Sequence, residues 1–64
     1  MEKELDTMLK VIDVQKHLGI SKNKVYALIQ SKGFPKIIIG HRYFIPKKQY
    51  EKWIEENIKH TIFL

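Results

Sequence analysis

Side chains able to bind a ligand are densest in residues 22–30, "KNKVYALIQ". Val25, Leu28 and Ile29 recur at the spacing of one helix face, which predicts a helix from about Lys22 to Ser31 with that face in a core. The opposite face then presents Lys22, Asn23, Tyr26, Ala27 and Gln30. A helix with its side chains is about 10–12 Å across, close to the ~12 Å width of the major groove of DNA. The segment therefore predicts a helix that enters this groove.

The side chains on that face divide by chemistry. Asn23 and Gln30 are candidate base readers, because their amides can pair with the edge of adenine through two hydrogen bonds. Lys22, Lys24 and Tyr26 are candidate phosphate contacts, since ammonium and hydroxyl groups donate to phosphate oxygens.

The start of this helix is also suited to an anion. Ser21 is the expected N-cap, because its hydroxyl can accept a free amide proton of the first turn. Lys24 puts positive charge near the positive end of the helix dipole, a mild cost that a bound phosphate would remove. Ala27 is small enough to let the backbone approach DNA closely. Ser21 and Ala27 therefore join the candidate DNA-binding residues.

A β-hairpin is expected after this helix, over "KIIIGHRYFI" at residues 36–45. A two-residue turn at Gly40 would put Ile39 opposite Arg42, whereas a three-residue loop would put Ile39 opposite Tyr43. We expect the three-residue loop, because it gathers the apolar side chains of both strands on one face.

The tip of this hairpin is basic. Lys36, His41 and Arg42 lie around a glycine turn, which is typical of a wing that follows the DNA backbone or inserts arginine into the minor groove. Lys47 and Lys48 come directly after the second strand and are expected to contact the adjacent phosphates.

The remaining signals complete one small domain. A short helix is expected over Ile12–Leu18, ended by Gly19, and Leu9 before it can pack or pair as an extended piece. Pro46 suits the start of a last helix, whose apolar side chains are Tyr50, Trp53, Ile54 and Ile58. The order helix, tight turn, helix, hairpin, helix predicts an α+β winged helix-turn-helix fold over residues 9–64, after a flexible segment at residues 1–8.

Composition agrees with a polyanion as the partner. The chain has 64 residues and a net charge of +5, and all its acids lie near the two ends. Between Val14 and Tyr50 it carries eight Lys or Arg residues and no acid, a segregation that suggests one basic face. Cysteine is absent and no apolar run is long enough for a membrane span, so we expect a cytoplasmic protein without a membrane partner.

Catalytic and metal sites are not expected. His17, His41 and His60 fall on three separate elements without a Cys, Asp or Glu at ligand spacing. Asp13 and His17 are four residues apart and are interpreted as an ion pair on one helix face. No nucleophile and no glycine-rich phosphate loop accompanies them, so we expect no enzymatic activity, no cofactor and no small-molecule substrate.

The order of these motifs resembles a known family. The pieces "VIDVQKHLGIS", "NKVYALIQ", "GFPKIIIG" and "RYFIPKKQYEKWI" are similar to the small winged helix-turn-helix proteins of phage and transposon excisionases and prophage regulators. They are distantly similar to the DNA-binding half of MerR-type regulators. The resemblance implies an accessory protein of a mobile genetic element that binds direct repeats beside an attachment site, bends the DNA and helps a tyrosine integrase to excise the element. One module of this size buries only roughly 600–1,000 Å² on DNA, so useful occupancy would need neighbouring copies or a bound recombinase.

Two other functions stay open at this point. One is a small transcriptional regulator that acts on a nearby promoter. The other is a protein-interaction module, such as an antitoxin or anti-repressor, that binds its partner through an apolar wing face and tail. The apolar C-terminal residues are expected either to pack on Ile38 and Phe44 or to dock a second copy or an integrase; they are Ile58, Ile62, Phe63 and Leu64.

Overall fold

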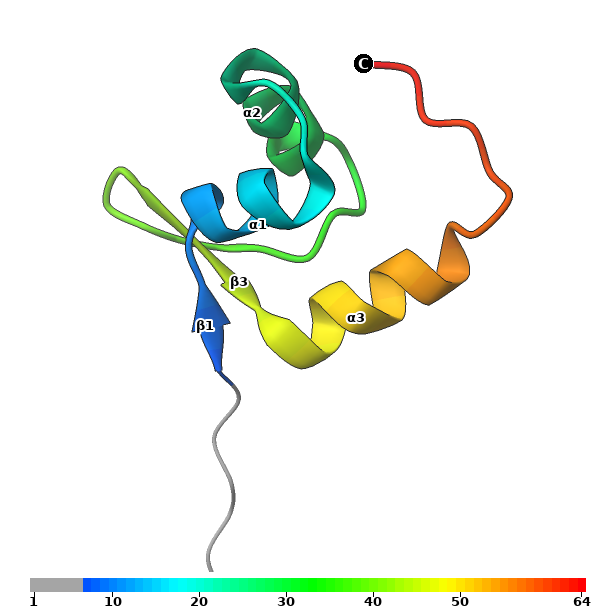
Figure 1. Ribbon diagram of the computed structural model, residues 1–64. Coiled ribbons are helices and arrows are strands. Elements are labelled where there is room, and N and C mark those ends of the chain that lie inside the picture. Colours follow the sequence, from blue (N-terminus) through cyan, green and yellow to red (C-terminus); the bar gives the residue numbers. More distant parts are fainter. Residues whose placement is uncertain (1–6) are drawn as a thin grey trace, which may run out of the picture.

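The computed structural model describes residues 7–64, and residues 1–6 of the expected N-terminal segment lie outside the described residues. The elements in chain order are β1 (Met8–Leu9), α1 (Val11–Leu18), α2 (Lys22–Gln30), β2 (Ile37–Ile39), β3 (Arg42–Pro46) and α3 (Lys47–Glu56) (Figure 1). Three helices and a small antiparallel sheet make up the α+β winged helix-turn-helix fold, so the predicted fold class is confirmed.

Local signals account for the helix-turn-helix. Helix α1 begins at Val11, one residue earlier than expected, because the Asp13 carboxylate accepts a hydrogen bond of 2.8 Å from the backbone N–H of Lys10. It ends at Gly19, whose φ of 68° lies in the left-handed region that glycine adopts without strain. The chain then reaches Ser21 and starts α2, so the two helices are joined by a tight turn.

The core gathers one face from each helix and one strand. Its buried side chains come from all three helices, from β3 and from the chain after α2; they are Val14, Val25, Leu28, Ile29, Phe34, Ile45 and Tyr50. Phe34 and Trp53 make an edge-to-face contact with ring centroids 4.9 Å apart, which fastens α3 beneath the helix-turn-helix. Tyr50 and Trp53 are therefore core residues, as their helical spacing predicts.

The extended piece expected at Leu9 pairs as a third strand of the sheet, with a partner that the sequence did not indicate. Strand β3 lies between β1 and β2, with Leu9 of β1 opposite Ile45. The N–H of Lys47 donates a hydrogen bond of 2.8 Å to the carbonyl of Thr7, which continues this pairing to the start of α3. Met8, the last residue of the expected flexible segment, belongs to β1.

The hairpin register differs from the expectation. Ile39 pairs with Arg42 and Ile38 with Tyr43, so the connection is a two-residue turn and the expected three-residue loop is wrong. Gly40 has a φ of 62°, and a glycine with positive φ in the first central position suits a two-residue hairpin turn. The apolar face expected from Ile37 opposite Ile45 does not form, because Leu9 of β1 lies opposite Ile45 and Ile37 lies opposite Phe44.

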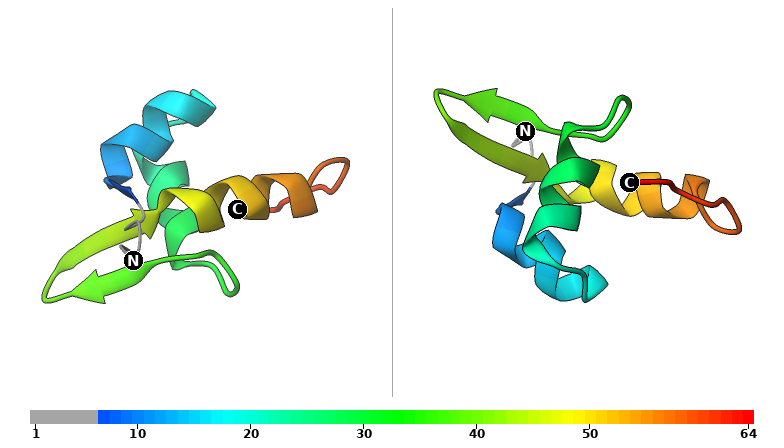
Figure 2. Two further views of the ribbon diagram at one scale, coloured as in Figure 1. Left: turned by 90° about the horizontal axis from the view of Figure 1, so that it is seen from below. Right: turned by 90° about the horizontal axis from the view of Figure 1, so that it is seen from above.

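The C-terminal tail does not pack on the hairpin. Helix α3 ends at Glu56, and Ile62 and Leu64 lie in a groove with Leu18, Ile20 and Leu28. The chain after α3 lies on the side of the molecule away from the tip of the wing (Figure 2). The expected packing of the tail on Ile38 and Phe44 is therefore wrong.

The expected ion pair between Asp13 and His17 is also wrong, because both side chains have other partners. Asp13 accepts the hydrogen bond from Lys10, and Nδ1 of His17 lies 2.8 Å from the hydroxyl of Tyr50. The two rings meet edge to face, with centroids 5.6 Å apart. His17 thus joins α1 to α3 instead of stabilising its own helix.

The buried phenol of Tyr50 gives a prediction on stability. Burial raises the pKa of Tyr50 above its ordinary value of 10.0. The folded state then keeps the phenol proton where the unfolded chain has lost it, so this contribution is complete below pH 10 and declines as pH rises through the raised pKa. Tyr50→Phe should cost about 1 kcal/mol at neutral pH through the lost hydrogen bond, and should make the alkaline decline shallower. Denaturant unfolding between neutral pH and pH 11 measures both effects, and equal alkaline slopes for the two proteins would contradict the assignment.

Candidate nucleic-acid interface

Helix α2 has the two faces that its sequence predicts. Val25, Leu28 and Ile29 are buried. All the predicted contact residues on the helix are exposed; they are Ser21, Lys22, Asn23, Lys24, Tyr26, Ala27 and Gln30. The polar face is therefore available to a ligand along the whole length of the helix.

The N-terminus of α2 is capped but carries no acid. The hydroxyl of Ser21 accepts a hydrogen bond of 3.3 Å from the backbone N–H of Lys24, which confirms the predicted cap. The first turn contains Lys22 and Lys24 and no acidic residue. The lysines and the positive end of the helix dipole thus add up to a local positive potential.

The wing lies next to α2. Nε2 of Gln30 donates a hydrogen bond of 3.4 Å to the hydroxyl of Tyr43, which is on strand β3. This contact joins the exposed end of α2 to the hairpin. Because Gln30 is engaged here, its amide has fewer free donors for a base than the sequence alone suggests.

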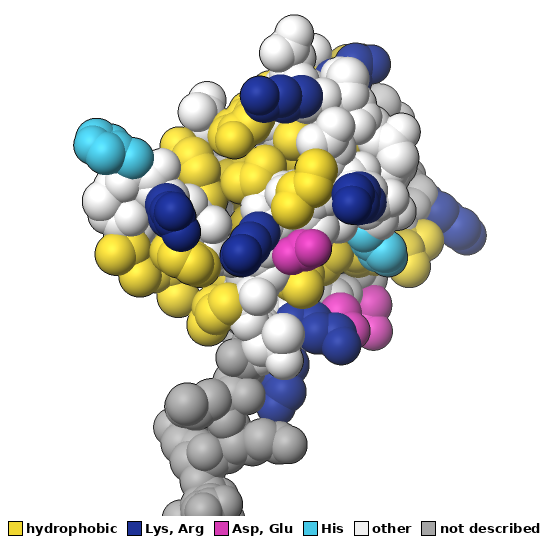
Figure 3. Space-filling view, turned by 60° about the vertical axis from the view of Figure 1, so that its left-hand side comes forward, with side chains coloured by type: hydrophobic (Ala, Val, Ile, Leu, Met, Phe, Trp, Pro, Cys, Tyr) yellow, Lys and Arg dark blue, Asp and Glu magenta, His cyan; other side chains and the backbone are white. Residues whose placement is uncertain are grey.

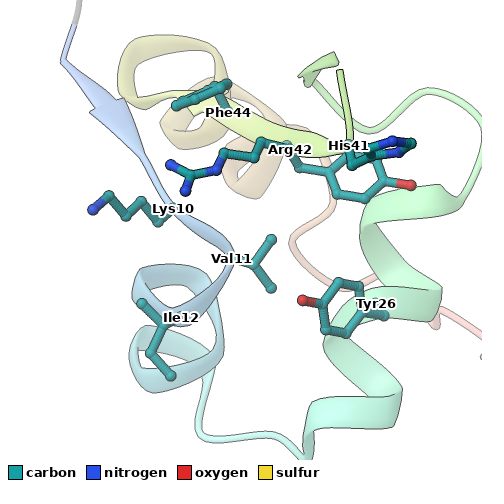
Figure 4. Close-up of a pocket in the computed structure, with 8 residues that line it drawn as sticks. Lys10, Val11, Ile12, Tyr26, His41, Arg42 and Phe44 are labelled. Atoms are coloured by element: carbon teal, nitrogen blue, oxygen red, sulfur yellow. The ribbon is translucent and has the colours of Figure 1, made fainter. Parts of the chain in front are cut away.

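A hollow of about 370 Å³ opens between α1, α2 and the wing. Residues from all three elements line it: Lys10, Val11, Ile12, Tyr26, His41, Arg42, Tyr43 and Phe44. The structure therefore brings Tyr26 together with His41 and Arg42, although Tyr26 is far from these two in the sequence. In Figure 4 the side chains of Arg42 and Lys10 extend toward the same side, with Val11 between Lys10 and Tyr26.

The hollow adds residues that sequence reasoning missed. Lys10 precedes α1 and lies in a stretch that contains acids, outside the basic segment between Val14 and Tyr50. Its position at the start of the first helix of a helix-turn-helix, which crosses the DNA backbone in known complexes, is the signal that could have found it. In Figure 3, Lys and Arg side chains are spread over this side of the molecule with hydrophobic side chains exposed between them.

The other predicted basic residues lie outside this hollow. Nζ of Lys36 is 3.5 Å from the carbonyl oxygen of Ser31, so it sits at the C-terminal end of α2, at the base of the wing and not at its tip. Lys47 lines a separate hollow between α1 and α3, together with Asp13 and Glu51. Lys48 is exposed on the first turn of α3.

The described residues do not assemble a metal site or a membrane helix. Within residues 7–64, no three His, Cys, Asp or Glu side chains converge as metal ligands would. None of the helices described here has the length and apolar character to cross a bilayer.

Comparison with known proteins places the chain among DNA-binding domains. Residues 8–58, most of the chain, match the family model described as a helix-turn-helix domain. This is a family of DNA-binding domains and not of enzymes. No curated protein and no solved structure gives a significant match.

The capping of α2 can be tested by stability. Ser21→Ala removes the acceptor of the Lys24 N–H and should lower the free energy of unfolding by about 1 kcal/mol. Ser21→Asp should restore most of that loss, because a carboxylate both caps the helix and offsets its dipole. Thermal unfolding followed by circular dichroism measures the series. Equal midpoints for Ser21→Ala and the unchanged protein would show that the cap contributes nothing.

Proposed function

We propose that this chain, which belongs to the helix-turn-helix domain family and is a DNA-binding protein, is an excisionase-like accessory factor of a mobile genetic element. Helix α2 enters the major groove and the β2–β3 wing reaches the adjacent minor groove. The observation that carries this proposal is the hollow in which Tyr26 of α2 and Arg42 of the wing face the same space.

The hollow lies where a strand of bound DNA would pass. A helix in the major groove and a wing in the next minor groove are separated by one sugar–phosphate strand. That strand has to cross the space between α2 and the wing. Lys10, His41 and Arg42 supply positive or donor groups around this space, and Val11 and Phe44 supply apolar surface for the deoxyribose. The hollow therefore matches both chemical parts of a DNA backbone.

The residues take different roles in this arrangement. Lys22, Lys24 and Tyr26 contact phosphates at the edge of the major groove, and Asn23 reads a base from the exposed face of α2. Gln30 reads a base only if it exchanges its hydrogen bond with Tyr43 for one with DNA. Ser21 contributes by capping α2, and Ala27 contributes because its small side chain lets the helix backbone approach DNA closely.

The remaining predicted contacts lie at the periphery. Lys36, Lys47 and Lys48 reach phosphates beyond the hollow and add to the electrostatic attraction. A lysine that contacts phosphate in this way contributes to affinity without reading sequence.

An accessory role suits a domain of this size. A single small DNA-binding module buries roughly 600–1,000 Å² of its surface on DNA, so high occupancy needs neighbouring copies or a bound recombinase. The resemblance to excisionases supports a tyrosine integrase as that recombinase.

The same DNA-binding geometry would serve a transcriptional regulator at a nearby promoter, and deletion of the gene distinguishes the two functions. Unchanged excision of the element in the deletion strain would exclude the excisionase role.

A protein-interaction module is the second candidate, because of the apolar groove of about 340 Å³ beside the tail. Salt dependence distinguishes it from a DNA-binding protein. If about six phosphates are neutralised, log affinity against log salt should have a slope near −5. Fluorescence anisotropy with duplexes from the ends and promoter of the element measures this slope, and footprinting locates the site. No binding to any of these duplexes would leave the protein-interaction function.

The separate roles of backbone and base contacts give a mutational prediction. Arg42→Ala and Lys10→Ala should each weaken binding to specific and random DNA alike and reduce the salt slope by about one, because each removes one phosphate contact. Asn23→Ala should instead relax the preference at one base pair by about 1–3 kcal/mol. Lys52→Ala is the control. Lys52 is an exposed lysine of α3, and it lines a different hollow from the one that Lys10 and Arg42 line. An equal loss for Asn23→Ala on specific and random DNA would show that Asn23 does not read a base.

A further inference from the structure

The wing exposes apolar side chains toward its tip. The exposed fraction rises along β2 from 42% at Ile37 to 58% at Ile38 and 62% at Ile39. Ile39 is the last residue before the turn, and the two-residue connection places it directly opposite Arg42. Side chains of opposed residues in an antiparallel pair project from the same face. An exposed isoleucine and an arginine therefore project together at the end of the hairpin.

The two faces of the wing differ in what covers them. Ile38 lies opposite Tyr43, whose hydroxyl accepts the hydrogen bond from Gln30, so this face of the hairpin is turned to α2. Ile39 and Arg42 lie on the other face, because side chains alternate along a strand. From that face Arg42 lines the hollow beside Lys10 and Phe44. Ile39 is the last residue of β2 on that face before the turn, and it is 62% exposed.

The charge around Ile39 indicates the kind of surface that covers it. His41 and Arg42 lie at the turn next to Ile39, and residues 36–48 contain no acid. A partner that buries the tip must therefore be negative close to the apolar contact. The minor groove of DNA meets this requirement, because its negative potential attracts arginine while its base steps accept apolar side chains.

We propose that Ile39 is an apolar wedge, which enters a base step of the minor groove beside Arg42 and kinks the DNA. The inference rests on the proposed DNA-binding mode and adds the residue that bends the duplex. A hairpin tip with a two-residue turn is narrow enough to approach the minor groove, which is about 6 Å wide. Burial of the isoleucine side chain offsets part of the cost of unstacking the step, and Arg42 holds the wedge in place.

This mechanism has consequences for the DNA. Side-chain wedges open the minor groove and bend the duplex by about 20–90° toward the major groove. Pyrimidine–purine steps such as TA and CA unstack most easily, so such a step is expected where the wing lies. Preference at that position would arise from deformability and not from hydrogen bonds to the bases.

The test uses a 30-base-pair duplex selected by the unchanged protein from a random library. Donor and acceptor dyes at its ends report bending, and 2-aminopurine at the step under the wing reports unstacking. Ile39→Ala should lose at least about half of the bend and most of the 2-aminopurine signal. Its affinity should fall by no more than ~10-fold, because phosphate contacts supply most of the binding.

Ile38→Ala is the matched control, because it removes the same side chain from the neighbouring exposed position on the face turned to α2. It should bend and unstack the duplex like the unchanged protein, and circular dichroism should show that both variants fold.

A full bend with Ile39→Ala, or an equal loss of bending with both variants, overturns the wedge. If the unchanged protein binds the duplex but leaves it straight, the wedge fails and the DNA-binding function stands. If it selects no duplex at all, the DNA-binding function fails as well.

Discussion

The burial of three side chains of α2 is the interaction on which the rest of the structure depends. Val25, Leu28 and Ile29 belong to a core of seven buried residues within the described part of the chain. A domain of this length has a marginal core, because small chains bury a smaller share of their surface. Any large tilt of α2 would expose part of that core. The polar face of the helix is therefore held in one orientation by the packing of the other.

The remaining elements act mainly as supports for α2 and the wing. Phe34, Tyr50 and Trp53 form an aromatic group under the helix-turn-helix, and His17 joins it from α1. The pairing of β1 with β3 then brings Met8 and Leu9 beside the second strand of the wing and places Lys10 at the edge of the hollow. Strand β1 therefore has two effects: it extends the sheet, and it positions Lys10 for the proposed contact with DNA.

The wing is supported less than α2. Only one of its strands, β3, is paired on both sides, and the isoleucines of β2 stay exposed. The Gln30–Tyr43 hydrogen bond is a link between the wing and α2, and its distance of 3.4 Å is long for a strong bond. Helix α2 is fixed by the core, whereas the wing has few contacts with the rest of the domain. This difference suits a protein in which α2 reads the major groove and the wing adjusts its position to the DNA beside it.

The sequence by itself determined the three helices, the Ser21 cap, the Gly19 termination and the two faces of α2. These features depend on residues within one or two helical turns of each other, so spacing and cap chemistry report them directly. The tertiary structure alone decided which strand the extended piece at Leu9 pairs with, the hairpin register, the place of the tail and the entry of Lys10 into the hollow. Each of these depends on contacts between distant segments: Leu9 with Ile45, and the tail with Leu18 and Ile20. A local pattern carries no information on which distant surface will cover an apolar side chain, because several surfaces of similar chemistry compete and only the packed chain selects one.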